Sequence, residues 1–429
     1  MEVLKIINNT ILALFIIIYS YQLLFVPVSL LGRAVERAKR KKGSLSKPPA
    51  LLRYAVLICA RNEEAVIGEL IDSIKSQTYP IELVTTFVLA DNCTDATAEA
   101  ARGHGAIVYE RQDTKHVGKG YALGYLLARI GEDYGDIFDG YLVFDADNIL
   151  MPDYIERMNE MFAGGKYEII TSYRNSKNYA DNWISAGYGL NFLRDACCHN
   201  HARSLLGTSC FVSGTGFLFS RRIKNKIGGW TYHMLSEDIE FTADQITSGV
   251  QIGFCRAAEF FDEQPTDFIQ SWHQRMRWSK GYLQMYRKYG KKLILGFLCG
   301  NFACFDLTMS TLPAMLLSFV GIVANVTLAV AGALLGDNIM IAVESLAESS
   351  VRAYLTLYAL GLLITLVEWK RIRTTAAKKL LYTFTFPLLM FTYIPIAFTA
   401  LFARVTWKPI KHSVTGRTES LISTRDDAL

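Results

Sequence analysis

The chain has 429 residues, of which 51% are hydrophobic and 20% are charged, and its net charge is +5. This apolar content excludes an intrinsically disordered protein, and the length allows one large domain together with a second, apolar part. Because the positive charge is small and gathers in one short segment after residue 32, a nucleic-acid-binding face is excluded as well.

The first apolar segment, residues 11–31, is nearly free of charge and predicts a membrane span. A helix of about 20 residues crosses the hydrocarbon layer. A signal peptide is the alternative, but the segment is long, the residues before it are only weakly basic, and no small-x-small cleavage site follows it. We therefore assign residues 1–32 to an uncleaved transmembrane helix.

A basic cluster in residues 33–50 follows, which we interpret as a juxtamembrane linker. Its cations are Arg33, Arg37, Lys39, Arg40, Lys41 and Lys42, with Glu36 the only acid among them. Such a cluster holds its end of a span on the cytoplasmic side and can contact anionic headgroups of membrane lipids.

Residues 51–290 have the sequence pattern of a cytosolic α/β domain. Strands are predicted at 54–60, 83–90, 106–109 and 141–144, and amphipathic helices at 66–74 and 96–102. Strands that alternate with helices indicate a parallel sheet, whose ligands gather at the carboxyl ends of the strands. Glu63, Asp91 and Asp145 all follow such ends.

Two carboxylates, Asp145 and Asp147, follow the apolar segment 141–144. Side chains two apart in an extended strand point the same way, so both can face one point while Ala146 turns aside. Adjacent carboxylates in a dry site repel unless a cation lies between them. We therefore predict that they bind Mg²⁺ or Mn²⁺ carried on a diphosphate, although Asp-Ala-Asp after a strand is by itself more often a solvated turn.

A basic, glycine-flanked loop at residues 115–120 opens a further helix. Its Lys119 can neutralise phosphate charge, and the glycines permit close approach of the backbone. A solvated lysine at a helix start is the alternative. Asp91, together with Asp95, is suited to accept hydrogen bonds from a base or a ribose.

Together these motifs resemble the nucleotide-sugar half of a family-2 inverting glycosyltransferase. The resemblance implies a GT-A fold, which is an α/β, Rossmann-like domain, here inserted between transmembrane helices. The order of the motifs is similar to that in the membrane synthases of cellulose, chitin and hyaluronan. One departure is Ala90, where the family's nucleotide motif often begins with an aspartate. The matching stretches are Ala60-Arg61-Asn62-Glu63, Asp91 to Asp95, Lys119, Asp145-Ala146-Asp147, Ser213-Gly214-Thr215-Gly216-Phe217, Ser236-Glu237-Asp238 and Gln274-Arg275-Met276-Arg277-Trp278.

The resemblance implies a role for each motif. Asp238, with Glu237 beside it, matches the catalytic base, which takes a proton from the acceptor hydroxyl as the diphosphate leaves. The residues expected to bind the donor, a UDP-sugar, are Ala60, Asn62, Glu63, Asp91, Lys119, Asp145 and Arg277. The residues expected to bind the acceptor are Gly214, Thr215, Gly216, Gln274 and Trp278.

Two of these roles have structural alternatives. Ser236 and Glu237 also read as the cap and first turn of a helix. Trp278 and its neighbouring arginines also suit a helix anchored at a membrane interface.

The remaining sequence predicts the membrane half. Residues 291–305 are assigned to an interfacial amphipathic segment, residues 306–403 to three or four spans, and residues 404–429 to a polar tail in which residues 413–429 are expected to be disordered. Three spans leave the carboxyl end outside, whereas the basic residues of the tail favour the inside. Either a fourth crossing lies between residues 302 and 350, or the last segment, broken by Pro387 and Pro395, is re-entrant.

The leading hypothesis is a multi-pass enzyme of the plasma membrane whose catalytic domain is cytoplasmic. It would use a UDP-sugar as donor, with UDP-GlcNAc or UDP-Glc expected first, to elongate a growing glycan processively and to export it. An export partner or a homo-oligomer is possible. Nucleic acid is excluded as a partner. Transfer of a single sugar to a lipid acceptor is the alternative. An inactive polysaccharide-binding or secretion subunit is the second alternative, against which the intact Asp145, Asp147, Asp238 and Arg277 argue.

Overall fold

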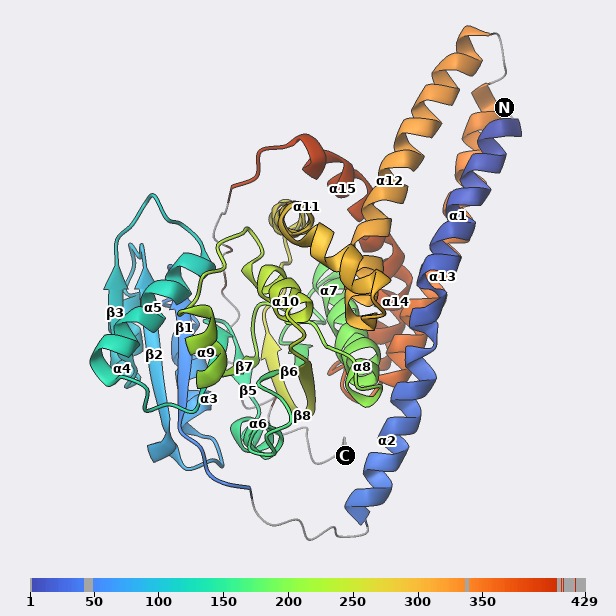
Figure 1. Ribbon diagram of the computed structural model, residues 1–429. Helices are drawn as coiled ribbons and strands as arrows, with labels where there is room; N and C mark the ends of the chain where they lie inside the picture. Colours follow the sequence, from blue (N-terminus) through green and yellow to red (C-terminus); the bar gives the residue numbers. More distant parts are fainter. Residues whose placement is uncertain are drawn as a thin grey trace.

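The computed structural model describes residues 2–41, 49–335, 339–406, 410, 412 and 421, and it contains an α/β domain and a group of long apolar helices (Figure 1). The α/β domain is built on an eight-stranded sheet with the strand order β3-β2-β1-β4-β7-β6-β8-β5. Its strands are β1 Tyr54–Ala60, β2 Val84–Asp91, β3 Ile107–Arg111, β4 Gly140–Asp145, β5 Ile149–Leu150, β6 Ile169–Ser176, β7 Phe217–Ser220 and β8 Ile252–Asp262.

The first half of the sheet is parallel, as predicted. β1 pairs with β2 and with β4, and β2 pairs with β3, all in parallel. Cys59 on β1 lies opposite Asp145 on β4, and Ala60 lies opposite Ala90 on β2. The carboxyl ends of these strands therefore finish at one level, and the residues that follow them share one edge.

Helices cover both faces of the sheet because successive residues of the central strands, all apolar, point to opposite sides. Tyr54, Val56 and Ile58 pack with α3 and α6, whereas Ala55 and Leu57 pack with α5 and α7. The predicted α/β architecture is confirmed. The helices of this domain are α3 Ile67–Lys75, α4 Thr97–Gly103, α5 Lys119–Tyr134, α6 Tyr154–Phe162, α7 Trp183–Arg194, α8 His201–Leu205, α9 Arg221–Ile227, α10 Glu237–Thr247 and α11 Phe268–Leu298, with a 3₁₀ turn at Ile81–Leu83 and a π-helix at Asp195–Asn200.

Four helical segments of the described chain are long and apolar enough to cross a membrane. Figure 1 shows α1, α12 and α13 side by side, projecting away from the sheet. The segments are Val3–Ala38, Phe302–Leu334, Ala342–Val367 and Ala376–Phe402. They are formed by α1 Glu2–Leu23 with α2 Phe25–Lys41, by α12 Phe302–Leu334, by α13 Ile339–Val367, and by α14 Ala376–Phe391 with α15 Tyr393–Phe402.

Two predicted boundaries differ from the structure. The segment assigned to a linker from residue 33 is helical as far as Lys41, and Arg33 in it is buried in an ion pair with Glu368. The predicted interfacial helix at 291–305 is not a separate element, because α11 runs on to Leu298. It ends two residues before Gly300, whose φ of 84° leaves the helical region.

The end of the chain returns to the catalytic domain. Nδ1 of His412 lies 3.0 Å from Oε1 of Glu63. Leu421 is 5% exposed and packs with Ile149, Met151 and Phe261. His412 and Leu421 therefore both contact the α/β domain. Apart from Leu421, the disorder expected for residues 413–429 falls outside the described residues.

Candidate active site

Two asparagines shape the loops at the ends of β1 and β2. Asn62 and Asn92 have φ values of 59° and 54°, and no other non-glycine residue in the described ranges has a positive φ. Oδ1 of Asn62 accepts a hydrogen bond from the backbone N of Thr94 at 2.8 Å. The side chain of Ala60 is buried in the core beneath them. Asn62 and Ala60, both predicted to bind the donor, therefore shape the backbone around the donor site.

Asp91 is held by an arginine that the sequence reasoning missed. Arg111 donates from Nε to Oδ1 of Asp91 at 2.7 Å and from Nη2 to Oδ2 at 3.0 Å. The two residues lie opposite each other on β2 and β3. Arg111 Nη2 also donates to the carbonyl of His116 at 2.9 Å, so the pair fixes the loop that leads to Lys119. The register of a parallel pair is the signal that could have revealed Arg111.

Lys119 lies at the centre of the site. Its Nζ donates to the carbonyl of Gly214 at 2.8 Å and to Oδ1 of Asp145. Burial opposes its charge, but Asp145 and Glu237 outweigh burial and raise the pKa of Lys119. It is therefore a cation beside the predicted metal ligand, and the solvated-lysine alternative does not fit this position.

The Asp145–Asp147 turn is fixed by the chain around it. The backbone N of Asp145 donates to Oγ1 of Thr215 at 3.0 Å, and the Thr215 hydroxyl donates to Oδ1 of Asn148 at 2.5 Å. Oδ2 of Asp147 accepts from the backbone N of Glu263 at 2.7 Å. The solvated-turn alternative is therefore not observed.

The two carboxylates fit a divalent cation that arrives with a diphosphate. No cluster of three or more Asp, Glu, His or Cys side chains suited to a metal occurs in the described part of the chain. Mg²⁺ commonly takes one or two carboxylates and completes its shell with substrate phosphates and waters. Asp145, whose side chain is 39% exposed, and Asp147 meet that requirement.

The glycine motif packs partly into the sheet. Thr215 is fully buried, and a Cβ on Gly216 would lie 2.1 Å from the ring of Phe260. Both residues therefore face the interior of the sheet with their side-chain positions, so any contact with the acceptor would come from their backbone, and that contact stays a prediction. Gly214 alone faces the predicted base, since its Cβ position is 3.4 Å from Oδ2 of Asp238.

The two predicted catalytic carboxylates begin α10. Ser236 makes no capping hydrogen bond there. Instead, the preceding loop is held by Glu240, whose Oε2 accepts from the backbone N of His233 and of Met234, both at 3.0 Å. Glu240 therefore anchors the helix start, and the catalytic roles of Glu237 and Asp238 stay predictions.

Both carboxylates titrate above their ordinary range. Burial, together with the charge of Asp238, raises the pKa of Glu237 to about 7. Burial also raises the pKa of Asp238, against the opposing effects of the Ile239 backbone N and of the cations Arg277 and Lys119. A buried acid pair of this kind is typical of general acid–base sites.

α11 joins the site to the membrane half. Arg277 donates to the carbonyl of Leu235 at 2.7 Å, and its charge acts on Glu237 and Asp238. The ring of Trp278 packs edge-on against Tyr188, with 5.8 Å between centroids, and it is partly exposed. It lies in an apolar cluster with residues of α7 and with Leu389 of α14, and both of its predicted roles stay predictions.

Gln274 and Arg275 lie on the same helix but differ in their hydrogen bonds. Oε1 of Gln274 is buried without a hydrogen-bond partner in the described structure. Arg275, which no prediction singled out, is fully buried and donates to the carbonyl of Leu389 at 3.1 Å and to Oγ1 of Thr392. Arg275 thus holds α14 and α15 against the catalytic domain.

Three further cations reach the predicted metal ligands. Arg174 pairs with Asp262, and its charge acts on Asp145 and Asp147. Lys177 donates to the carbonyl of Asp147 at 3.1 Å. The pKa of His412, which pairs with Glu63, is raised to about 10. Burial opposes the positive charge of this ring, but the carboxylates of Asp147, Glu63 and Glu263 stabilise the charge more strongly than burial opposes it. None has a local sequence signal, because each comes from a distant element.

The model of the family described as "Glycosyltransferase like family 2" matches residues 49–281. The chain belongs to this family. β-Monoglucosyldiacylglycerol synthase of Synechocystis sp. is 28% identical over 242 residues, which are 55% of this chain and 49% of that protein. Poly-β-1,6-N-acetyl-D-glucosamine synthase of Staphylococcus epidermidis is 24% identical over 235 residues, 52% of this chain and 53% of that protein. The chain thus spans about half the length of these relatives.

A solved structure shows the same fold over nearly the whole chain. The mannosyltransferase PcManGT from Pyrobaculum calidifontis, in complex with GDP-Man and Mn²⁺, superposes with a TM-score of 0.55 at 16% identity. The match covers 91% of this chain and 99% of that one. The predicted GT-A fold is confirmed, and so is the prediction of a family-2 glycosyltransferase.

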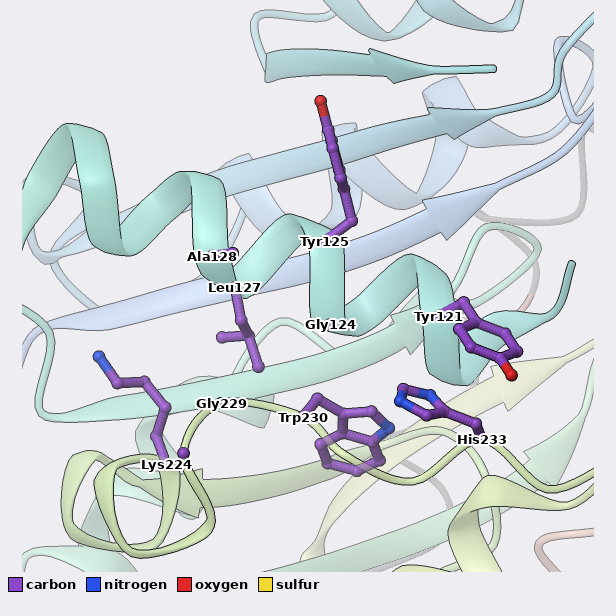
Figure 2. Close-up of a pocket in the computed structure, with 10 residues that line it drawn as sticks. Tyr121, Gly124, Tyr125, Leu127, Ala128, Lys224, Gly229, Trp230 and His233 are labelled. Atoms are coloured by element: carbon purple, nitrogen blue, oxygen red, sulfur yellow. The ribbon is translucent and has the colours of Figure 1, made fainter. Parts of the chain in front are cut away.

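A separate hollow of the glycosyltransferase lies outside this site. It has a volume of about 310 Å³ and lies between α5 and residues 224–233. Figure 2 shows Tyr121 beside His233 at one end, and their rings stack at 4.2 Å between centroids. Lys224 in its wall pairs with Asp136. No predicted donor, acceptor or metal residue lines this hollow.

The acid pair predicts a pH-dependent stability. Because folding raises the pKa of Glu237 from 4.5 to about 7, the folded protein binds more protons than the unfolded chain between these values. The free energy of unfolding is therefore expected to fall as the pH rises through this range. Thermal unfolding of the detergent-solubilised protein measures this slope, which Glu237→Gln should flatten. An unchanged slope in that variant contradicts the assignment to Glu237.

Gly214 gives a second prediction with a matched control. Gly214→Ala places a side chain at a φ of 82° and beside Asp238, so it is expected to lose about 1–2 kcal/mol of stability and also to slow transfer. Gly228→Ala has a φ of 69° and open space around its Cβ. It should lose similar stability and keep its transfer rate. Equal rates in the two variants would show that Gly214 has no part in the acceptor site.

Proposed function

We propose that this glycosyltransferase moves one hexose from a UDP-sugar, UDP-glucose first, to a hydroxyl group of a membrane lipid. The observation that carries the proposal is the position of the acid pair against α11, which is tied directly to the membrane helices. Lys280 on α11 donates to the carbonyl of Ala400 on α15 at 2.9 Å, and Arg275 binds α14. A lipid acceptor in the membrane would therefore present its headgroup to Asp238.

The chain's own residues divide the reaction between them. In this scheme Asp238 accepts the proton of the lipid hydroxyl while that oxygen attacks the anomeric carbon and the bond to the diphosphate breaks. Lys119 and Arg277 stabilise the charge that develops on the leaving group. A divalent ion held by Asp145 and Asp147 supplies further neutralisation when bound. Displacement in one step inverts the configuration of the sugar.

The proposed setting is the plasma membrane, with the catalytic domain in the cytoplasm. The basic residues that close the first helix support this orientation. The described tail residues also lie on the catalytic domain, where a re-entrant α14–α15 segment would return them.

Polymer elongation is the second candidate, and it is supported by the similarity to the poly-N-acetylglucosamine synthase. The exposed apolar side chains of α12 suit contact with membrane lipid, from which a lipid acceptor would come. The similarity to a synthase named for a glucosyldiacylglycerol product supports it too. The exposed row consists of Leu316, Val320, Val323, Val326, Val330 and Leu334.

The test is the fate of a labelled sugar. Purified protein is given radiolabelled UDP-glucose, UDP-N-acetylglucosamine or UDP-galactose in micelles that contain a total lipid extract of its source cells. We expect label from one donor in the chloroform-soluble fraction, and none when the lipid extract is left out. Label that remains in water-soluble or insoluble polymer supports the second candidate instead.

A further inference from the structure

A buried ion pair connects the catalytic domain to the membrane helices. Arg203 on α8 donates from Nε to Oδ2 of Asp306 on α12 at 2.7 Å and from Nη2 to Oδ1 at 3.2 Å. Asp306 is fully buried, and Arg203 is 2% exposed. Tyr21 on α1 donates to Oδ1 of the same carboxylate at 2.7 Å. Two of the long apolar helices therefore bind one arginine of the catalytic domain.

The pair does more than hold two surfaces together. Charges that leave water lose hydration energy, and apolar side chains of similar size can pack such an interface equally well. What the two-pronged contact between Arg203 and Asp306 adds is a fixed orientation of the guanidinium group. Nη2 of Arg203 also donates to Oγ of Ser310, one turn further along α12, at 3.3 Å.

The remaining arm of this guanidinium group points into the catalytic domain. Nη1 of Arg203 donates to Oδ1 of Asn200 at 3.2 Å. The same oxygen accepts from the backbone N of Phe211 at 3.2 Å, and Nδ2 of Asn200 donates to the carbonyl of Phe211 at 3.4 Å. The guanidinium carbon lies 3.8 Å from the centroid of the Phe211 ring, which is a cation–π contact. Arg203 and Asn200 thus fix both the backbone and the ring of Phe211.

Residues 211–214 continue from this fixed point into the active site. The carbonyl of Gly214 accepts from Nζ of Lys119 at 2.8 Å. The Cβ position of Gly214 lies 3.4 Å from Oδ2 of Asp238. A path of direct contacts therefore runs from α1 and α12, through Arg203, to the segment that touches both the predicted base and the cation proposed for the leaving group.

We infer that Arg203 and Asn200 are positioning residues for sugar transfer. Oriented by Asp306, they fix residues 211–214, and Gly214 then holds its place beside Lys119 and the predicted base. The rate of transfer therefore depends on how α1 and α12 pack against the catalytic domain. The inference rests on the proposed function for the role of the base, and it applies to whichever acceptor receives the sugar.

Asn200→Ala tests this path without breaking the ion pair. Alanine makes no side-chain hydrogen bond to Arg203 or Phe211, so residues 211–214 lose their anchor. We expect kcat to fall roughly 10- to 100-fold, because a small misplacement of the reacting groups costs about that much. Lys119 is also held by Asp145, so UDP binding and the KM for the donor should stay within about threefold of wild type.

Asn159→Ala is the matched control. Asn159 on α6 is also a buried amide, and its Oδ1 accepts from the hydroxyl of Tyr54 at 2.7 Å. Tyr54 begins β1, whose opposite end leads to the active site, so this change is remote from residues 211–214. The control should also lose stability and yet keep its kcat. An unchanged kcat in Asn200→Ala, or an equal fall of kcat in Asn159→Ala, overturns the inference.

A double-mutant cycle tests the membrane end of the path, because contiguity alone does not prove coupling. Asp306→Glu keeps the charge but lengthens the side chain, so it displaces Arg203 and should also lower kcat. In the Asn200→Ala background the same change should have little further effect, since the path is already broken. Independent losses that multiply would show that the ion pair only attaches the helices, and they would overturn the coupling.

Failure of this inference can be told apart from failure of the proposed function. The product is first identified with the wild-type protein, and the rates of the variants are then compared for that product. A polymer product overturns lipid glycosylation and leaves the comparison of rates in force. A lipid product formed at equal rates by wild type and Asn200→Ala overturns only the positioning role.

Discussion

Asp238→Asn is expected to reduce sugar transfer by about 10²- to 10⁴-fold, which is what a positioned general base contributes. Asparagine has nearly the same shape but cannot accept the proton of the acceptor hydroxyl. Donor affinity should change no more than a few-fold, because the donor contacts proposed for Lys119 and Asp145 remain. The measurements are the rate of sugar transfer and the binding of UDP to purified protein.

Glu237→Gln is the matched comparison for this variant. It leaves the proton acceptor in place, with the pKa of Asp238 still set by burial, the Ile239 backbone N, Arg277 and Lys119, so most of the transfer rate should persist. Equal loss of donor binding and transfer in Asp238→Asn would instead make the residue part of the α10 start. If Glu237→Gln lost all transfer activity while Asp238→Asn kept high activity, Glu237 would be the general base and Asp238 its neighbouring carboxylate.

Asp147→Asn is expected to have the second large effect. Its Oδ2 accepts from the Glu263 backbone N at 2.7 Å and its Oδ1 accepts from Nδ2 of Asn148 at 3.3 Å, so both oxygens are oriented by the chain and keep lone pairs for a cation on the diphosphate. Loss of one group that stabilises the leaving charge typically costs about 10²- to 10³-fold in rate. We expect the variant to extract and unfold like wild type, and to need a higher Mn²⁺ concentration for what activity remains.

The control for Asp147→Asn is Asp72→Asn, at an exposed carboxylate on α3. It removes the same charge and should leave both the rate and the Mn²⁺ requirement unchanged. Full activity of wild-type protein in excess chelator would remove the basis for a metal role of Asp145 and Asp147.

The sequence predicted the parallel edge of the sheet well, because that edge depends on local patterns. Apolar strands that end in Glu63, Asp91 and Asp145 are adjacent in a parallel sheet, so their order along the chain places their ends together. The four apolar segments were visible for a similar reason, since length and hydropathy are local properties.

What the sequence could not predict depends on contacts between distant elements. Arg111, Arg174 and Arg275 are ordinary arginines until the fold brings each to a partner. Thr215 and Gly216 belong to a motif predicted to bind the acceptor, and their packing against Asn148 and Phe260 could not be predicted from that motif. The continuity of α11 was missed because an amphipathic segment reads the same whether it is a separate helix or the end of a longer one.

The most direct measurement of the central claim is the mass of the product made by the purified wild-type protein from its preferred UDP-sugar and the lipid extract. We predict that each product lipid gains the mass of one hexose and that no longer product accumulates as donor is consumed. A ladder of products separated by one sugar mass would contradict the account, and it would show that the chain is a polymerase.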